Sequence, residues 1–547
     1  MNNFIKNFIN ICLKKKIWLP AAVIAVLYLW HLGCYGLIDP DEGRYADVPR
    51  EMLAAGDFIT PHLNGVEFFD KPVLQYWAAA FFMALFGTNE FAARLFPALC
   101  ALGGIAAAYR LGSEMFGRRI GIRAAIMLAS SLLYFIIGSI NILDMAVSFF
   151  ITLAMASYYL FSVRERRAGR KYLYLFYAAM ALGVLTKGLI AVVLPGIIIA
   201  LYIVLTKQYS LLRRSVSLPG LLIFAAIAVP WFYLVCRANP DFFYYFFIEE
   251  HFLRYATKMY NRFQPWYFFL PCLILGVFPW TGYMLASLRK IFQKPFQLPH
   301  SQVYLLIWTG VIFLFYSASS SKLVPYIVPC VAPLILLTAA KLDDLAVLKP
   351  GLIINSIASL IFLAAFIIAA MYTDFIEVPE LVHFGLPLLA ILAITPALTL
   401  YLYRRQKYAA ALKASLIAGL LLCFSLQPVI STVASHRTGR DTAQIVSQWK
   451  SDDTVLIGYK DHLRSLPFYT GSRVMLYGCL GELEFGSKHP DGQGWFLNVP
   501  AELNRIWHNS PDIIIVIPQR LRSDAGATLD LTTARTAETE NYIIVKK

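Results

Sequence analysis

The stretch LIDPDEGRYADVPREML, residues 37–53, follows an apolar run and contains Asp39, Asp41, Glu42, Arg44 and Asp47. Charged residues are scarce elsewhere: they make up 15% of the 547 residues, whereas 59% are hydrophobic, and the mean hydropathy is +0.61. Soluble proteins typically contain about 25% charged residues. The composition therefore excludes a soluble globular enzyme and indicates a protein of the lipid bilayer, in which such a group of charges requires an explanation.

Apolar runs of about 20 residues, the length that crosses a bilayer, recur along most of the chain. The first run is not followed by a small-residue cleavage site, so we expect a retained anchor rather than a signal peptide. We predict thirteen membrane-spanning segments, at residues 17–37, 91–111, 121–140, 145–162, 172–186, 188–206, 218–236, 266–287, 302–318, 323–340, 351–371, 384–403 and 411–429.

Basic residues cluster on alternate loops, near residues 14–16, 118–119, 164–171, 207–214, 289–294 and 404–407. Because loops rich in Lys and Arg stay on the cytoplasmic side, this pattern predicts a cytoplasmic N-terminus and a C-terminus on the opposite side. Topology signals and contacts with membrane lipids also explain the formal net charge of +15. No basic patch lies on a soluble segment, so nucleic-acid binding is not expected.

Two domains are predicted. Residues 1–429 form a polytopic α-helical membrane domain, whose outer loops 38–90 and 237–265 contain amphipathic and aromatic stretches suited to the membrane interface. Residues 430–547 contain the β-rich runs DTVLIGY, RVMLYG, DIIIVIP and NYIIVKK, with helical candidates near 459–468 and 500–508, and predict a small α/β domain. The eight cysteines are dispersed, without metal or redox spacing.

The opening stretch has a structural interpretation. Asp39 suits the N-cap of a helix, Pro40 its first position, and Glu42 completes an arrangement like a capping box. This leaves Asp41 and Arg44 unexplained. Charges at the outer mouth of a helical bundle are also what a site for a charged, membrane-delivered substrate needs.

Four more candidates lie where the chain enters or leaves apolar sequence. In FFDKPVLQYW, Asp70 and Lys71 form either a surface ion pair or, through the ammonium group, a contact for a lipid phosphate. Asp144 in NILDM and Lys187 in LTKG stand at predicted span ends, where an ionisable residue is a functional candidate. Helix capping by Asp144 and snorkelling of Lys187 are the alternatives.

Two further segments carry candidates. In EEHFLRY, Arg254 suits an ion pair within a helix, while His251 could share a metal ion with Asp70. In SSSKLVPYIVP, Lys322 and Tyr326 are four residues apart, on one face if the segment is helical, and both could donate to a phosphate. Interfacial aromatic anchoring is the alternative for the tyrosine.

On the predicted topology, all of these residues face the outer side of the membrane. Acids that suit an amino sugar and cations that suit a phosphate would therefore occur on the same face. The pattern favours chemistry on an anionic, lipid-linked substrate.

The segment DPDEGRYADVPREMLAAGDFITPHLNGVEFFDKPVLQYW, residues 39–77, together with NILDM, LTKG and SSSKLVPYIVP, resembles the lipid A aminoarabinose transferases of Gram-negative bacteria. These are polytopic GT-C glycosyltransferases related to the protein O-mannosyltransferases. The resemblance implies transfer of 4-amino-4-deoxy-L-arabinose from undecaprenyl phosphate to a phosphate of lipid A at the periplasmic face of the inner membrane. That modification of lipopolysaccharide lowers its negative charge and gives resistance to polymyxin and other cationic peptides.

The resemblance also implies roles for single residues. Asp41 and Asp144 match the active-site acids of the family, and Asp70 with His251 resembles its metal site, a zinc site, with aspartate in place of the family's glutamate. No other cofactor is implied. The residues implied or considered for binding the substrate and the donor phosphate are Lys71, Arg254, Tyr326, Lys187, Lys322, Arg44 and Glu42.

Two other functions stay open at this point. A related polyprenyl-phosphate-sugar transferase would differ in its acceptor, a protein or a polysaccharide. A secondary transporter would place ionisable residues near mid-membrane, on broken helices in two repeated halves. The candidate charges cluster at one face and no such repeat is visible, which disfavours the transporter.

Overall fold

The structure is a computed structural model that describes residues 18–253, 264–372, 378–529 and 534–547. The chain divides into two compact units. Unit 1 comprises residues 1–32, 97–233 and 244–429, and unit 2 comprises residues 33–96, 234–243 and 430–547. The predicted domain division at residue 430 stays a prediction.

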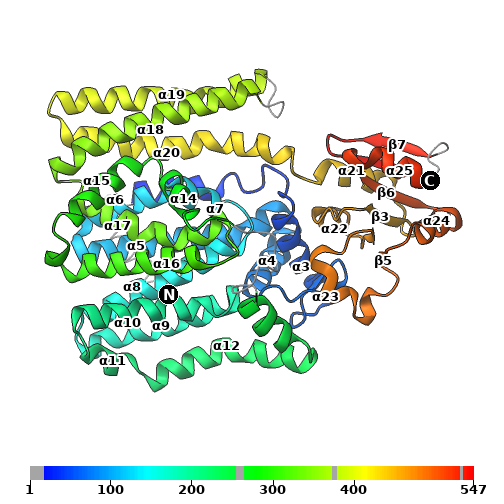
Figure 1. Cartoon of the computed structure of the whole chain (residues 1–547), viewed down its shortest axis with the longest axis horizontal. Coiled ribbons are helices and arrows are strands. Elements are labelled where there is room, and N and C mark those ends of the chain that lie inside the picture. The colour runs from blue at the N-terminus through cyan, green and yellow to red at the C-terminus, as the bar shows by residue number, and fades with distance from the viewer. Residues whose placement is uncertain (1–17, 254–263, 373–377, 530–533) are drawn as a thin grey trace. The chain divides into compact units, whose positions relative to one another are not determined.

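Unit 1 consists of helices (Figure 1). Those in it wholly or for most of their length are α2 (Trp18–Leu29), α5 (Glu90–Phe116), α6 (Arg118–Ala129), α7 (Leu132–Gly138), α8 (Leu143–Ser162), α9 (Arg166–Lys187), α10 (Ile190–Thr206), α11 (Ser210–Ser215), α12 (Leu218–Ala238), η1 (Tyr244–Leu253), α14 (Phe269–Gly276), α15 (Thr281–Phe292), η2 (Pro295–Gln297), α16 (His300–Ala318), η3 (Val324–Cys330), α17 (Val331–Lys341), α18 (Leu345–Tyr372), α19 (Val378–Arg404) and α20 (Tyr408–Ser435).

Within the described residues, eight helical segments are long and apolar enough to cross a membrane, or up to ten if two bent pairs each form one span. The pair α6 and α7 is bent by 65° and the pair α14 and α15 by 116°. Two of the three shorter apolar helices in the described residues, α2 and α10, fall on other predicted segments, whereas the third, at residues 74–86, lies in the predicted outer loop 38–90. The polytopic helical fold is confirmed, and the number of thirteen spans stays a prediction.

The helices of unit 1 differ in how much of their apolar surface is covered. The apolar window of α8 is 83% buried, whereas that of α18 is only 17% buried. Helices α18, α19 and α20 lie side by side (Figure 1) and share a core around Leu388, Leu392 and Leu422. Since apolar surface left exposed by α18 needs a hydrocarbon environment, we assign this helix to the lipid-facing side of unit 1.

Unit 2 contains a six-stranded sheet in the order β5-β4-β3-β6-β8-β7. Its strands are β3 (Val455–Tyr459), β4 (Met475–Tyr477), β5 (Phe496–Leu497), β6 (Ile513–Pro518), β7 (Arg535–Glu538) and β8 (Tyr542–Lys546). Strands β5, β4, β3 and β6 are parallel, and β8 and β7 continue the sheet antiparallel. All six residues of β6, IIIVIP, are buried, as expected of a central strand covered on both faces.

Helices and short elements complete unit 2. They are α3 (Asp41–Ala55), α4 (Leu74–Phe86), α21 (Arg440–Trp449), α22 (Ser465–Thr470), η4 (Gly481–Leu483), α23 (Glu484–Ser487), η5 (Pro490–Gly492), α24 (Pro500–Asn509), η6 (Gln519–Leu521), α25 (Arg522–Thr528) and the hairpin of β1 (His62–Leu63) and β2 (Val66–Glu67). The predicted β-rich runs coincide with β3, β4, β6 and β8, and the two helical candidates overlap α22 and α24.

The hairpin β1–β2 fastens an early loop of unit 2 to its sheet. Asn64 and Gly65 occupy its turn with φ of 53° and 72°, the conformation that favours an Asn-Gly pair in a two-residue hairpin. The side chain of Asn64 donates to the carbonyl of Val474 at 2.7 Å and accepts from its N–H at 2.8 Å. The Asn64 side chain thus makes the two hydrogen bonds to the Val474 backbone that a neighbouring strand could make, although the two residues are 410 positions apart.

Candidate active site

The predicted capping box before α3 is wrong. Pro40, not Asp39, directly precedes the helix, and no side chain caps its N-terminus. Asp39 instead accepts hydrogen bonds from the backbone N–H of Ser465, at 2.9 Å, and from its hydroxyl. Burial of this carboxyl group raises the pKa of Asp39 to about 7.

The buried carboxylate of Glu42, in the first turn of α3, anchors the start of this helix. Glu42 is 1% exposed, and its two oxygens accept hydrogen bonds from Arg94, each at 2.7 Å. Arg94 is fully buried and also donates to the carbonyls of Tyr35 and Gly36, each at 2.8 Å. The pair therefore joins the start of α3, where Asp41 lies, to the segment that precedes it.

Asp41 forms an ion pair with Arg44 one turn further along α3, yet its side chain remains 52% exposed. On its other side, the Arg44 guanidinium lies 3.4 Å from Glu482. Glu482 also accepts a hydrogen bond of 3.0 Å from Arg464. A chain of alternating charges thus connects the exposed Asp41 to the C-terminal part of unit 2.

Glu482 in this charge chain and the neighbouring His462 have altered pKa values. Burial alone would raise the pKa of Glu482, but the hydrogen bonds from Arg464 and the charge of Arg44 lower it overall, so the carboxylate is ionised. Burial, together with the nearby charge of Arg464, lowers the pKa of His462 to about 3, so that its imidazole is neutral. Its Nε2 atom has no hydrogen-bond partner among the described residues.

Asp70 and Lys71 pair with each other, but not at the surface, where the first sequence interpretation placed the pair. The Lys71 ammonium lies 2.8 Å from the Asp70 carboxylate and donates to the Asp70 carbonyl at 2.6 Å. Both side chains are largely buried, 13% exposed for Lys71 and 14% for Asp70. The lysine is therefore held in a defined position, in which an anionic ligand would not have to order it.

Unit 1 brings together three of the predicted residues. Asp144 in the first turn of α8 forms an ion pair with Lys187, the last residue of α9. The Lys187 ammonium also lies 4.4 Å from the ring centroid of Tyr326, in η3. The Tyr326 ring packs against Tyr316 at 5.5 Å. An acid, a cation and a phenol from three helices thus form one group.

Lys322 lies just before η3 and does not share an α-helical face with Tyr326, since the segment that contains Pro325 and Pro329 is a 3-10 helix. The Lys322 side chain is 5% exposed and donates to the backbone carbonyls of Ser319, at 2.5 Å, and Gln264, at 3.0 Å. These contacts give it a structural use in addition to the predicted phosphate contact.

Two candidates cannot be placed. Arg254 lies outside the described residues, and only the backbone of His251 is described, in η1. Within the described part of the chain, no three His, Cys, Asp or Glu residues gather as metal ligands. The ammonium of Lys71 already neutralises Asp70, which does not suit this carboxylate to a metal ion. The metal pair of Asp70 and His251 stays a prediction.

Sequence reasoning missed Arg94, His462, Arg464 and Glu482. Arg94 had a usable signal, because it is an arginine inside a predicted apolar span, where a charge needs a partner. The other three lie in a polar segment, where nothing in the sequence separates them from surface residues.

Comparison with known proteins defines the class first. Residues 70–234 match the family of dolichyl-phosphate-mannose-protein mannosyltransferases. The apo oligosaccharyltransferase of Archaeoglobus fulgidus matches 94% of the chain with a TM-score of 0.52 at 12% identity, a likeness of fold. The chain therefore has the polytopic GT-C glycosyltransferase fold.

Closer relatives define the family. The undecaprenyl phosphate-α-4-amino-4-deoxy-L-arabinose arabinosyl transferase of Shewanella sediminis is 31% identical over 498 residues, which is 88% of this chain and 90% of that protein. The chain belongs to this family and is a multi-pass membrane protein. The match to the Aeromonas salmonicida relative, 36% identical, spans 61% of this chain and 61% of that protein.

A solved structure agrees over nearly the whole length. The crystal structure of ArnT from Cupriavidus metallidurans bound to undecaprenyl phosphate superposes with a TM-score of 0.85 and 28% identity, covering 97% of both chains. The apo crystal structure of the same protein gives 0.84 and 27%. The similarity thus includes the outer loops and the C-terminal α/β segment.

Proposed function

We propose that this protein is a glycosyltransferase that moves 4-amino-4-deoxy-L-arabinose from undecaprenyl phosphate to a phosphate of lipid A. The observation that carries this proposal is the similarity, over 97% of both chains, to a relative whose crystal structure contains undecaprenyl phosphate. The names of the family's relatives support the sugar. The product would carry an added amino group, which makes the lipopolysaccharide less negative. This lower negative charge underlies resistance to polymyxin.

The proposed reaction needs the cations for one task and the acids for another. Loss of a lipid phosphate from the sugar leaves a negative charge, and cations held in place, such as Lys71 and Lys187, would stabilise it. Tyr326, whose ring touches the Lys187 ammonium, would support the same phosphate. Arg254 completes the proposed set of phosphate contacts, by resemblance to the family alone.

The acids would act on the sugar. The acceptor phosphate is already an anion, so it needs little deprotonation, and a strong general base is not required. Asp41, with its exposed carboxylate, would bind the donor's ammonium group or the positive charge that develops on the sugar ring. Asp144, held by Lys187, would be the second acid. Glu42 would act through Arg94 by holding in place the start of α3, where Asp41 lies.

The proposed topology follows from the basic loops: a cytoplasmic N-terminus, with the C-terminal domain and the site residues on the periplasmic side of the bacterial inner membrane. A cysteine-labelling experiment tests it. A single reporter cysteine at exposed Arg505, in a background that lacks the native cysteines, should react with an impermeant maleimide in intact spheroplasts. Labelling only after lysis would reverse the topology.

Mass spectrometry of lipid A tests the function. The host would lack its own transferase, make the donor lipid, and express wild type, Asp41→Asn or Asp441→Asn. Asp441 is a matched control because it is also an exposed acid in the first turn of a helix, α21. We expect aminoarabinose on lipid A with wild type and with Asp441→Asn, and none with Asp41→Asn at equal abundance. Unmodified lipid A with well-expressed wild type would contradict the proposal.

A second candidate function has support from one observation. The match to protein mannosyltransferases over residues 70–234 concerns enzymes named for a protein acceptor. A polyprenyl-phosphate-sugar transferase with a protein acceptor would leave lipid A unchanged in the experiment above, and would instead add a sugar to periplasmic proteins, which intact-protein mass spectrometry detects.

A further inference from the structure

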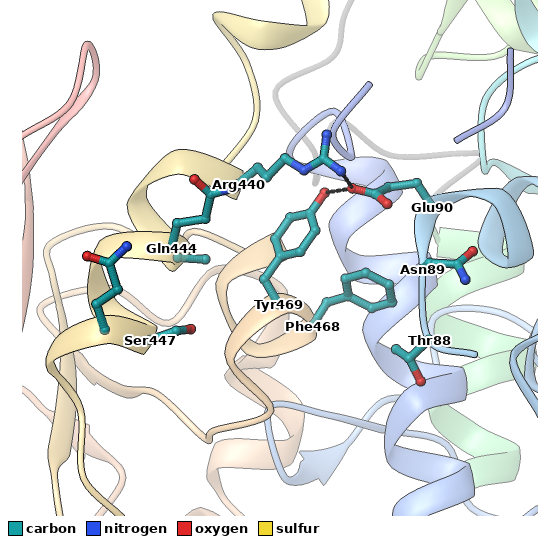
Figure 2. Close-up of a pocket in the computed structure, with 10 residues that line it drawn as sticks. Thr88, Asn89, Glu90, Arg440, Gln444, Ser447, Phe468 and Tyr469 are labelled. Atoms are coloured by element: carbon teal, nitrogen blue, oxygen red, sulfur yellow. Dashed lines mark hydrogen bonds and ion pairs between the residues drawn. The ribbon is translucent and has the colours of Figure 1, made fainter. Parts of the chain in front are cut away.

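A pocket of about 360 Å³ lies in unit 2, formed entirely by residues of that unit (Figure 2). Three segments line it: the turn at residues 88–90, one face of α21, and Phe468 with Tyr469 of α22. Figure 2 shows the two aromatic rings between the polar side chains of α21 and those of the turn. None of the residues proposed for the transfer reaction lines this pocket.

The two charges in the pocket neutralise each other. The carboxylate of Glu90, 8% exposed, lies 3.1 Å from the guanidinium of Arg440 and accepts a hydrogen bond of 3.0 Å from the Tyr469 hydroxyl. Tyr469 in turn accepts from the backbone N–H of Leu37 at 2.8 Å. These contacts hold one wall of the pocket in place and leave it without net charge.

The remaining polar groups are uncharged. On α21, the exposed residues Gln444, Ser447 and Gln448 face the pocket, although an exposed helix face usually contains Lys and Glu. Thr88 and Asn89 add a hydroxyl and an amide on the other side. Amides and hydroxyls both donate and accept hydrogen bonds, as the hydroxyl groups of a sugar do.

This composition selects the class of ligand. A phosphate would need a cation that is not already paired, and Arg440 is held by Glu90. A metal ion would need more than one carboxylate, and an acyl chain would need a mainly apolar lining. The partly exposed ring of Tyr469 beside amides and hydroxyls, with Phe468 packed in the core behind the lining, suits a ring that has polar edges and an apolar face.

We propose that this pocket is a binding site for uncharged sugar rings, separate from the residues that transfer the aminoarabinose. If the proposed function holds, on which this part rests, the rings are those of the acceptor glycolipid, and the pocket contributes to acceptor affinity. A saccharide from another source has the same chemistry, and the experiment below distinguishes the two.

The first measurement does not depend on activity. The full-length protein in detergent is mixed with a disaccharide of N-acetylglucosamine, and saturation-transfer-difference NMR detects binding. The test variant is Ser447→Trp, which fills the pocket from an exposed position, and the control is Asp441→Trp, on the same helix, exposed and outside the lining. We expect signal transfer with wild type and the control, and its loss in Ser447→Trp.

No signal with wild type, or an equal signal in Ser447→Trp, would overturn the sugar site. The kinetics of the transfer reaction then show whether the bound sugar rings belong to the acceptor or to another saccharide. If the rings belong to the acceptor, Ser447→Trp raises the KM for the acceptor at least fivefold, while kcat and the KM for the donor stay unchanged. An unchanged KM with loss of the NMR signal would overturn the acceptor assignment and retain the sugar site. Absence of transfer by wild type would instead contradict the proposed function.

Discussion

The carboxylate of Glu482 lies 3.4 Å from the guanidinium of Arg44, although the two residues come from opposite ends of the chain. Arg44 pairs in turn with Asp41, the acid proposed to bind the sugar. The C-terminal part of unit 2 therefore contributes directly to the electrostatic surroundings of a proposed catalytic residue, a role that its own sequence does not reveal.

Replacing Glu482 by Gln should lower both stability and the rate of transfer. Without the carboxylate, Arg44 and Arg464 are two cations with no anion between them, and we expect a loss of about 1–3 kcal/mol in the free energy of unfolding. We expect the transfer rate to fall roughly tenfold, equivalent to about 1.4 kcal/mol. The control is Glu484→Gln, whose side chain is 64% exposed. Equal transfer rates in the two variants would show that Glu482 does not contribute to the function of Asp41.

The buried pair of Glu42 and Arg94 should be strongly coupled. Arg94→Met leaves the buried carboxylate of Glu42 without its arginine and should cost about 3–5 kcal/mol of unfolding free energy. The double variant Glu42→Gln, Arg94→Met should cost less than the sum of the two single variants, because it removes both charges. Chemical unfolding in detergent measures the four proteins. Additive losses would show that the two side chains do not interact.

Asp39 should make stability depend on pH. Its pKa is raised to about 7 in the folded state, against about 4 in an unfolded chain, so between these values the folded protein binds more protons. The contribution of Asp39 to stability should therefore be complete below about pH 4 and fall as pH rises towards 7, by at most about 1.4 kcal/mol per pH unit. Asp39→Asn, which can keep both bonds to Ser465, should remove this contribution. The difference between the two unfolding curves against pH measures it, and parallel curves would contradict the assignment.

The positive charge of Lys187 should be required for turnover. Lys187→Met removes its pairing with Asp144 and its contact with the Tyr326 ring, and we expect kcat to fall by about 10²-fold or more, as for loss of a group that stabilises developing charge. Lys187→Arg should retain a larger share of the activity. The matched control is Lys207→Met, an exposed lysine at the end of α10. A change in KM alone would assign Lys187 to ground-state binding.

Chelation should not affect transfer. Because the carboxylate of Asp70 is paired with Lys71, we expect the rate after dialysis against EDTA to stay within about twofold of the starting value, a difference of about 0.4 kcal/mol in the barrier. Elemental analysis of the dialysed protein verifies removal of zinc. A loss of activity that added zinc restores would reinstate the predicted metal site.

The apolar pattern predicts the helices of unit 1 but not their breaks. Residues 266–287 contain one continuous apolar run, yet α14 ends at Gly276 and α15 begins at Thr281 after a bend of 116°. A hydropathy average adds up the apolar character of the residues in a window and contains no information on the direction of the chain. It therefore does not detect such a bend. Pro279 lies in the break and was the available signal.

In the sheet, strands were predicted where side chains are buried and missed where they are not. Strand β6 contains three consecutive isoleucines in its buried centre, whereas β7 is an edge strand with mostly exposed residues, and β5 has only two residues. In the candidate site, the roles of Asp41 and Asp144 stay predictions, and the pairing of Asp144 with Lys187 depends on tertiary packing. Nothing in the local sequence indicates that Glu482 meets Arg44.

The pairing of Asn64 with Val474 also constrains the order of events during biosynthesis. The two residues are 410 positions apart, and translation proceeds at about 5–20 residues per second, so roughly 20–80 seconds separate their synthesis. During that interval the segment around Asn64 exists without the sheet against which it packs. Arg44, the ion-pair partner of Asp41, likewise depends on Glu482, so the surroundings of Asp41 reach their final structure only after this late part of the chain has been synthesised.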